Sequence, residues 1–125
     1  MNATIRDQWV AALRSGQHRQ GFGRLVHRRL IGPYHCCLGV LCELAAQAGV
    51  VTRLPTCGSY VSSDGEVAVA YLPLKVRQWA GLPHDGSGLE EQVRTMNDCC
   101  NCTFAQIADV ISTQPGDEDA SKGAI

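Results

Sequence analysis

Two adjacent cysteines, Cys36 and Cys37, stand where a strongly patterned helix is predicted to begin, in the segment YHCCLGVLCEL at residues 34–44. The N-terminus of a helix carries a partial positive charge that favours a thiolate, so either sulfur can act as a nucleophile. A thiol hydrolase also needs an imidazole as general base, and the one histidine that follows the pair is His84. One hypothesis is therefore thiol catalysis by Cys37 or Cys36 with His84.

The residues around Cys37 loosely resemble the start of the NlpC-type peptidases of the papain-like class. CLGV at residues 37–40 and RLP at residues 53–55 stand where those enzymes have Cys-Ser-Gly on a helix and then Leu-Pro-Arg. Here leucine replaces the serine, and His84 falls in a loop rather than on a strand. We therefore expect both sulfurs to pack inside the fold, since free cysteine behaves as a small hydrophobe.

A second group of thiols comprises Cys99, Cys100 and Cys102. Cys99-x-x-Cys102 has the spacing of half a structural zinc site, which usually contains two such pairs, and Cys36 and Cys42 are spaced too widely to supply the other. The same pair before a helix is also an arrangement of redox dithiols. The total of seven cysteines without a secretory signal predicts reduced, mostly buried thiols and no cofactor.

Charge is distributed unevenly along the chain. Residues 1–62 carry seven basic and two acidic side chains, a net charge of +5, whereas residues 63–125 carry four basic and ten acidic ones, a net charge of −6. No acidic residue lies between Asp7 and Glu43, where arginines and histidines accumulate: Arg14, Arg19, Arg24, Arg28, Arg29, His18, His27 and His35. Such a segment favours contact with an acidic protein surface or a phosphate backbone, and internal pairing with the acidic half is the alternative.

Within this segment the sequence predicts a partner-binding surface. Arginine beside an aromatic residue is the side-chain chemistry of interface anchors. The predicted contact residues are Arg19, Phe22, Arg24, Arg28 and Arg29.

Nucleic-acid binding is a further alternative. The segment TFAQIADV at residues 103–110 looks like the first helix of a helix-turn-helix. No recognition helix follows it, and the acidic second half would repel phosphate.

The pattern of apolar residues predicts a compact α+β domain over residues 1–113, with about four helices and a small antiparallel hairpin or sheet. The predicted helices cover about residues 5–15, 36–48, 74–80 and the segment from Thr103 onward, while residues 89–96 fit a helix or an extended stretch. Two of these starts show capping boxes, Thr4 with Asp7 and Thr103 with Gln106.

Residues 17–34 are predicted to form a short strand or hairpin. A second hairpin is predicted around Asp64-Gly65, followed by a half-buried strand in which Val67, Val69 and Tyr71 alternate with smaller or polar residues. The segment 114–125 is predicted to be a disordered acidic tail. No apolar run is long enough to span a membrane, so we expect a cytoplasmic protein.

A broader resemblance covers most of the chain. The elements are WxxALRSG at 9–16, QGxG at 20–23, YxCCLGVLC at 34–42, YLP at 71–73, VRxWxGL at 76–82, MND at 96–98 and TFxxIA at 103–108. This order is similar to a set of small uncharacterised proteins of tailed phages and prophages, with their CCLGVLC and LND…SFxxIAD elements. The resemblance implies a compact α+β domain and a phage or prophage origin, and it brings no catalytic residues.

Phage accessory proteins of this size often act by occupying the surface of a host protein. The resemblance therefore implies a non-enzymatic binder of an acidic host protein in the host cytoplasm, for example an inhibitor of a host defence system of the anti-CRISPR type or of host transcription. This expectation comes from analogy of fold and origin rather than from a site.

Overall fold

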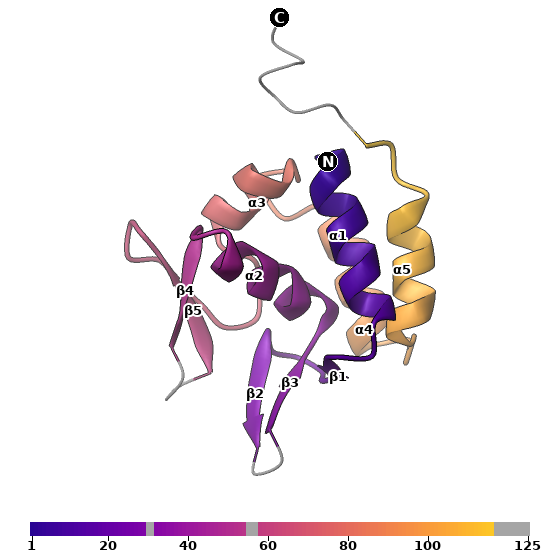
Figure 1. Cartoon of the computed structure of the whole chain (residues 1–125), viewed down its shortest axis with the longest axis horizontal. Helices are drawn as coiled ribbons and strands as arrows, with labels where there is room; N and C mark the ends of the chain where they lie inside the picture. The colour runs from indigo at the N-terminus through magenta and orange to yellow at the C-terminus, as the bar shows by residue number, and fades with distance from the viewer. Residues whose placement is uncertain (30–31, 55–57, 117–125) are drawn as a thin grey trace, which may run out of the picture.

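The structure is a computed structural model that describes residues 1–29, 32–54 and 58–116. The described chain forms an α+β fold of five helices and two three-stranded sheets, which confirms the predicted class (Figure 1). The helices are α1 (Ala3–Arg14), α2 (Cys37–Gln47), α3 (Leu74–Ala80), α4 (Leu89–Asp98) and α5 (Phe104–Ser112). The strands are β1 (Arg19–Gln20), β2 (Val26–Arg29), β3 (Gly32–His35), β4 (Val51–Leu54), β5 (Ser59–Ser62) and β6 (Val67–Ala68).

Both sheets are small and lie against the same central helix. The first has the order β1-β3-β2, in which β1 runs parallel and β2 antiparallel to β3. The second has the order β4-β5-β6 and is antiparallel throughout. Figure 1 shows α2 in the centre of the fold, with the strands below and to its left and with α1 and α5 side by side to its right.

A strand does follow Asp64-Gly65 as predicted, but the residues predicted to face inward are the exposed ones. Tyr60 of β5 is buried and pairs directly with Ala68, and paired residues share one face of a sheet. Ala68 is therefore buried, while Val67 and Val69 point outward and are exposed. The strand ends at Ala68 rather than Tyr71 because the next carbonyl, that of Val69, accepts a hydrogen bond from Leu25 N instead of a sheet partner.

The first helix begins earlier than its sequence pattern predicted. Asn2 caps α1, because its side-chain oxygen accepts a hydrogen bond from Ile5 N, and the capping box predicted from Thr4 is wrong. The Asn2 backbone N–H also donates to Ala80 O, which fixes this end of α1 to α3. The capping box at Thr103 is confirmed, with both of its hydrogen bonds present.

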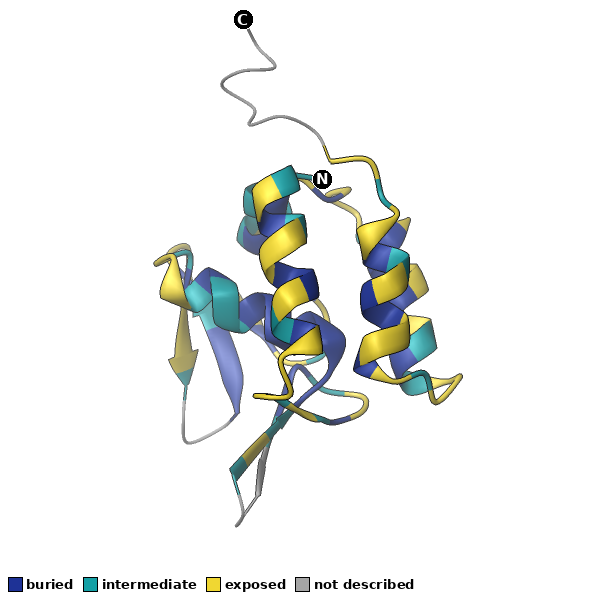
Figure 2. Cartoon of the chain, turned by 45° about the vertical axis from the view of Figure 1, so that its right-hand side comes forward, coloured by how far each residue is buried: buried dark blue, intermediate teal, exposed yellow. Residues whose placement is uncertain are grey.

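The core is centred on α2, which is buried on almost every side. The outer helices α1 and α5 are buried on one side only, so in Figure 2 they carry buried and exposed residues in stripes. Trp9 of α1 is completely buried, and its indole N–H donates to Cys37 O over 2.9 Å. Gly39 of α2 lies against the Leu25 backbone so closely that a Cβ there would sit 1.7 Å from Leu25 O. The central helix is therefore held by backbone contacts as well as by apolar packing.

A buried amide joins three separate segments of the chain. Asn97 Oδ1 accepts hydrogen bonds from Gln20 Nε2 and from Cys37 N, while its Nδ2 donates to Gly21 O. Asp98 beside it accepts from Gly23 N. The MND motif is therefore a structural clamp between α4, the loop after β1 and the start of α2.

Part of the predicted tail lies within the described residues. The predicted tail begins with residues 114–116, where Arg6 Nη1 donates to Gln114 O, and residues 117–125 lie outside the described residues. Among the described residues, none of the helices combines the length and the apolar character needed to cross a bilayer.

Candidate functional site

The two adjacent cysteines at the start of α2, Cys36 and Cys37, are core residues. Cys36 is 4% exposed at the N-cap of α2, and Cys37 is completely buried. Burial raises the pKa of Cys36 to about 11 and that of Cys37 well above its usual value, which outweighs the lowering effect of the helix start. The Cys37 thiol donates to Val93 O over 3.5 Å. Both sulfurs are therefore kept as thiols by their surroundings.

The predicted base does not meet these sulfurs. His84 is exposed in the loop between α3 and α4, where its carbonyl accepts from Arg77 Nη1. In the part of the chain that the structure describes, no contact joins its ring to Cys36 or Cys37. The arrangement that a thiol hydrolase requires is not formed by these residues.

The second thiol cluster lies at the surface. Cys99 and Cys100 are exposed and Cys102 is half-buried, so the expectation of mostly buried thiols is wrong for this cluster. Their position at the end of α4 and in the following turn is the reason, because the helix ends there and its last side chains face solvent. Over the described ranges, no group of three or more histidine, cysteine or acidic side chains is placed to hold a metal ion. Cys57 lies outside the described residues.

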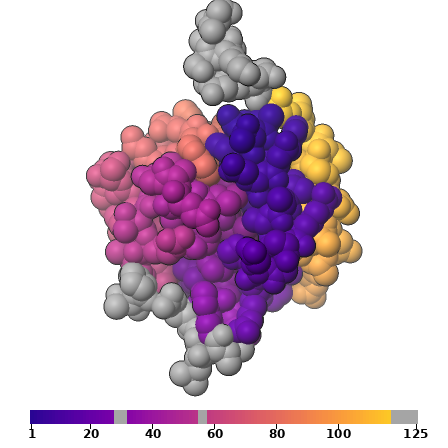
Figure 3. Space-filling model, viewed as in Figure 1, coloured from indigo at the N-terminus to yellow at the C-terminus, as the bar shows by residue number. Residues whose placement is uncertain are grey.

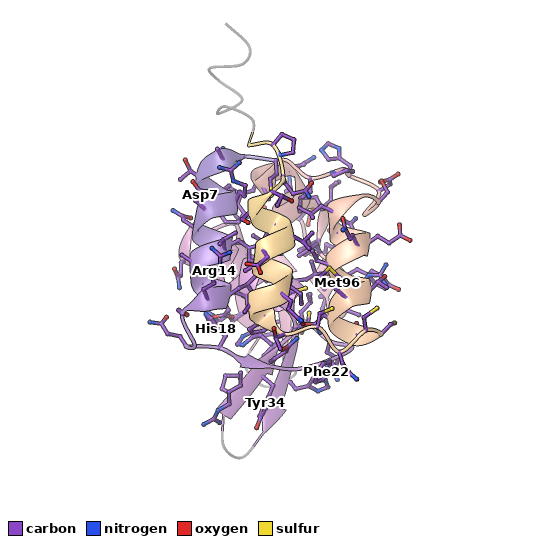
Figure 4. All side chains as sticks on the ribbon, turned by 90° about the vertical axis from the view of Figure 1, so that its right-hand side faces the viewer. Asp7, Arg14, His18, Phe22, Tyr34 and Met96 are labelled. Atoms are coloured by element: carbon purple, nitrogen blue, oxygen red, sulfur yellow. The ribbon has the colours of Figure 1, made fainter. Side chains whose placement is uncertain are left out.

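The predicted partner-binding residues are only partly described. Arg19 is exposed on β1 with its guanidinium 5.9 Å from the centre of the Tyr34 ring, and Phe22 is 49% exposed. Arg24 is half-buried. Figure 4 shows Phe22 and Tyr34 together at the strand end of the molecule. Arg28 and Arg29 contribute backbone to β2, and their side chains lie outside the described part.

Some of the basic segment pairs internally with the acidic half, as the alternative interpretation expected. Arg14 of α1 forms an exposed ion pair with Asp109 of α5, at 2.7 Å between Nη2 and Oδ1. In the space-filling view of Figure 3, the N-terminal residues (indigo) run down the face of the molecule, with magenta residues on their left and the orange and yellow residues of the C-terminal half on their right. Charge in the first half is therefore divided between internal pairs and the exposed strand end.

A polar cluster that sequence reasoning missed lies between the two sheets. Glu43 of α2 accepts hydrogen bonds from Arg53 Nε of β4 at 2.8 Å and from Tyr60 Oη of β5 at 2.6 Å. His35 of β3 places Nε2 3.5 Å from the same carboxylate. Three strands thus direct three donor groups at one carboxylate of α2.

These donors control the ionisation of Glu43. Burial alone would raise its pKa, but the hydrogen bonds from His35, Tyr60 and Arg53 lower it to about 2. Burial and the Glu43 carboxylate raise the pKa of Tyr60 far above its usual value. At neutral pH the cluster therefore contains an ionised, fully hydrogen-bonded carboxylate and a neutral phenol.

We expect Glu43→Gln to destabilise the protein at neutral pH and to lose this effect in acid. The folded-state pKa lies below that of an unfolded glutamate, near 4.5, so ionised Glu43 stabilises the fold above that pH. The contribution is lost as the pH falls from about 4.5 towards 2. Urea unfolding of both proteins across this range should show the difference in unfolding free energy shrinking. Glu91→Gln, on the exposed side of α4, is the control, and a pH-independent difference for Glu43→Gln would contradict the prediction.

Two hollows meet at this cluster. One, of about 250 Å³, lies between the hairpins and includes His35, Glu43, Arg53 and Tyr60 in its walls. The other, of about 210 Å³, includes His18 and Arg19 and shares His35 and Pro33 with the first. The rings of His18 and His35 meet edge to face, 5.2 Å between centres, and burial together with His35 lowers the pKa of His18.

Residues 1–115 match a family described as a domain of unknown function, DUF8296. The chain belongs to this family. No curated protein and no solved structure matches it. The DUF8296 match spans all the helices and strands described above, the cysteine segment and the polar cluster included.

The cluster of this DUF8296 chain left one signal in its sequence. Glu43 is the single charged residue on α2, whose other residues as far as Ala46 are apolar or small, and a carboxylate on a buried helix requires partners. That requirement could have been read from the pattern of α2. The identity of the partners could not, because they come from β3, β4 and β5, which the helix pattern does not position.

Proposed function

We propose that this DUF8296 protein is a phage- or prophage-type accessory protein that acts in the host cytoplasm by binding a host protein with an acidic surface. The sequence resemblance supports the origin, and the exposed strand end supports the binding role. We define the Arg19–Phe22 surface as Arg19, Phe22, Arg24 and Tyr34.

The observation that carries the proposal is an exposed aromatic ring on a rigidly held loop. Phe22 is 49% exposed, yet its neighbours are fixed: Gly21 N donates to His35 O, Asn97 Nδ2 donates to Gly21 O, and Gly23 N donates to Asp98 Oδ1. A large apolar side chain on a backbone that is already held in place loses less entropy on binding than one on a free loop. Aromatic residues and arginines are also the types most often found at the centre of interfaces.

The charge of this surface selects the kind of partner. Arg19 lies over the face of Tyr34, which orders its guanidinium and leaves the residue exposed. Guanidinium groups recognise carboxylates through paired hydrogen bonds. We infer that the bound protein presents acidic residues, as a host defence component or a transcription factor occupied by an inhibitor would.

The test is affinity capture from nuclease-treated bacterial lysate, followed by calorimetry with the captured protein once purified. The double variant Arg19→Glu with Phe22→Ala is expected to weaken binding by at least about a hundredfold, because loss of an anchor residue typically costs about 2 kcal/mol and two are lost. Arg14→Glu makes the same charge change on α1 and should bind as the wild type does. Equal binding by wild type and double variant would overturn the proposal.

A further inference from the structure

The two hollows beside His35 adjoin each other, and together we call them the His35 groove. Its halves share Pro33 and His35, with Arg53 in the wall of one half and His18 with Arg19 in the wall of the other. Each half is smaller than the roughly 300 Å³ at which sites for drug-sized molecules begin. The dimensions suit side chains of a bound segment rather than a cofactor.

Arg53 is oriented by one hydrogen bond and keeps further donor groups for a ligand. Its Nε donates to Glu43 Oε1, while Nη1 and Nη2 form no hydrogen bond within the described residues, and the side chain is 49% exposed. The Glu43 carboxylate is already engaged by three donor groups. An incoming anion would therefore meet a guanidinium edge held at a fixed angle, while the charge of Glu43 is shared among three hydrogen bonds, of which Arg53 supplies one.

His35 adds a second, independent observation. The residue is 5% exposed, and its Nδ1 is buried without a hydrogen-bond partner in the described chain. A buried polar group without a partner is destabilising and rare, so such a group calls for an explanation in a folded protein. In a neutral imidazole whose Nε2 donates to Glu43, Nδ1 is an acceptor, so a backbone N–H of a segment that enters the groove would supply the missing partner.

We propose that the His35 groove receives carboxylate side chains from an acidic segment of the partner protein, with Arg53 as the bidentate anchor. This inference rests on the proposed function and assigns it a specific recognition site. Apolar residues in the wall, Val26, Pro33 and Leu54, match the methylene stem of a glutamate. A phosphate backbone would instead need a longer row of cations, and the chain's second half carries a net charge of −6.

The probes are two acetylated, amidated peptides, Glu-Leu-Glu-Glu-Leu-Glu and its counterpart with glutamine at every glutamate position. Binding to the full chain is followed by ¹⁵N–¹H correlation spectra at low salt, including the Nε–H signals of arginine. The acidic peptide is expected to shift Arg53 Nε–H and the amides of His35 and Ser59, and the glutamine peptide is not. Arg53→Gln should weaken the binding of the acidic peptide by about tenfold, as expected for the loss of a charged hydrogen-bonded pair.

Two control variants separate groove binding from general attraction. Arg14→Gln removes one positive charge from α1 and should leave peptide binding unchanged. Arg53→Lys keeps the charge but loses the planar fork, so it should weaken binding as well. Each variant is compared with the wild type only when the dispersion of its amide spectrum shows that it is folded. If Arg53→Gln is not folded, Arg53→Lys takes its place in the comparison.

Three outcomes would overturn the groove assignment: equal binding of the two peptides, equal weakening by Arg14→Gln, or tighter competition by a DNA duplex than by the acidic peptide. Failure of the groove differs from failure of the proposed function. If a captured partner still depends on Arg19 and Phe22 but not on Arg53, the function stands and the groove does not. If capture is insensitive to Arg19 and Phe22, the function itself is wrong.

Discussion

Gly39→Ala is expected to lower the free energy of unfolding by at least about 3 kcal/mol, at the upper end of the cost of overpacking a core. Helix propensity alone would favour alanine by at most about 1 kcal/mol, the value for a helix interior, since Gly39 is the third residue of α2. The contact decides the sign, because a Cβ at Gly39 would lie 1.7 Å from Leu25 O and 2.6 Å from Leu25 C. These are backbone atoms, so no side-chain rotation can relieve the clash.

The segment around Leu25 has little freedom to move away. Leu25 is completely buried, and its N–H donates to Val69 O over 2.7 Å. Urea unfolding followed by circular dichroism measures the change, with Gln47→Ala on the exposed end of α2 as the control for introducing alanine into the same helix. A Gly39→Ala protein as stable as the wild type would show that α2 and the Leu25 segment do not pack as described.

Arg77→Met is expected to destabilise the protein by about 3–5 kcal/mol, the usual cost of removing one partner from a buried ion pair. Arg77 Nε and Nη2 donate to the two oxygens of Glu90 at 2.7 and 2.9 Å. Glu90 is 1% exposed, and its Oε2 also accepts from Leu72 N. Without the guanidinium, the Glu90 carboxylate would stay buried with only this backbone donor.

A matched exposed pair provides the comparison. Arg14→Met breaks the ion pair with Asp109, whose side chains are 47% and 73% exposed, and should cost less than about 1 kcal/mol. Adding Glu90→Leu to Arg77→Met should restore part of the lost stability, because the unpaired charge is removed. A cost for Arg77→Met no larger than that for Arg14→Met would mean that the Glu90 pair is not buried in solution.

Helices α1, α2, α3 and α5 could be predicted from sequence because their signals are local, whereas the pattern of residues 89–96 left helix and extended chain open for α4. The apolar spacing in α2 and the capping box at Thr103 operate over a few residues, and both are found in the structure. Strand β4 gave no comparable signal, since its burial pattern does not alternate and its pairing partner is supplied by β5. The outward face of β6 was misjudged for the same reason: Tyr60, on another strand, decides which of its residues turn inward.

The ionisation of the side chains depends on tertiary contacts more than the positions of the helices do. The sequence placed Cys36 and Cys37 at a helix start, where a thiolate is favoured, but burial against α1 and α4 reverses that preference. It also grouped His35 with the other basic residues, without indicating that Glu43 lies 3.5 Å away. A pKa depends on the dielectric surroundings and on the donors within a few ångströms, and these come from elements distant in the chain.

The amino-acid sequence by itself determined the α+β class, the central apolar helix and the uneven division of charge, because composition and short-range periodicity encode these properties. Tertiary structure alone decided that the paired thiols are buried, that Glu43 is held ionised by three elements, and that Phe22 is presented on a fixed loop. The physical reason is that burial and hydrogen-bond partnership are properties of the folded surface, which forms only when segments separated along the chain come together.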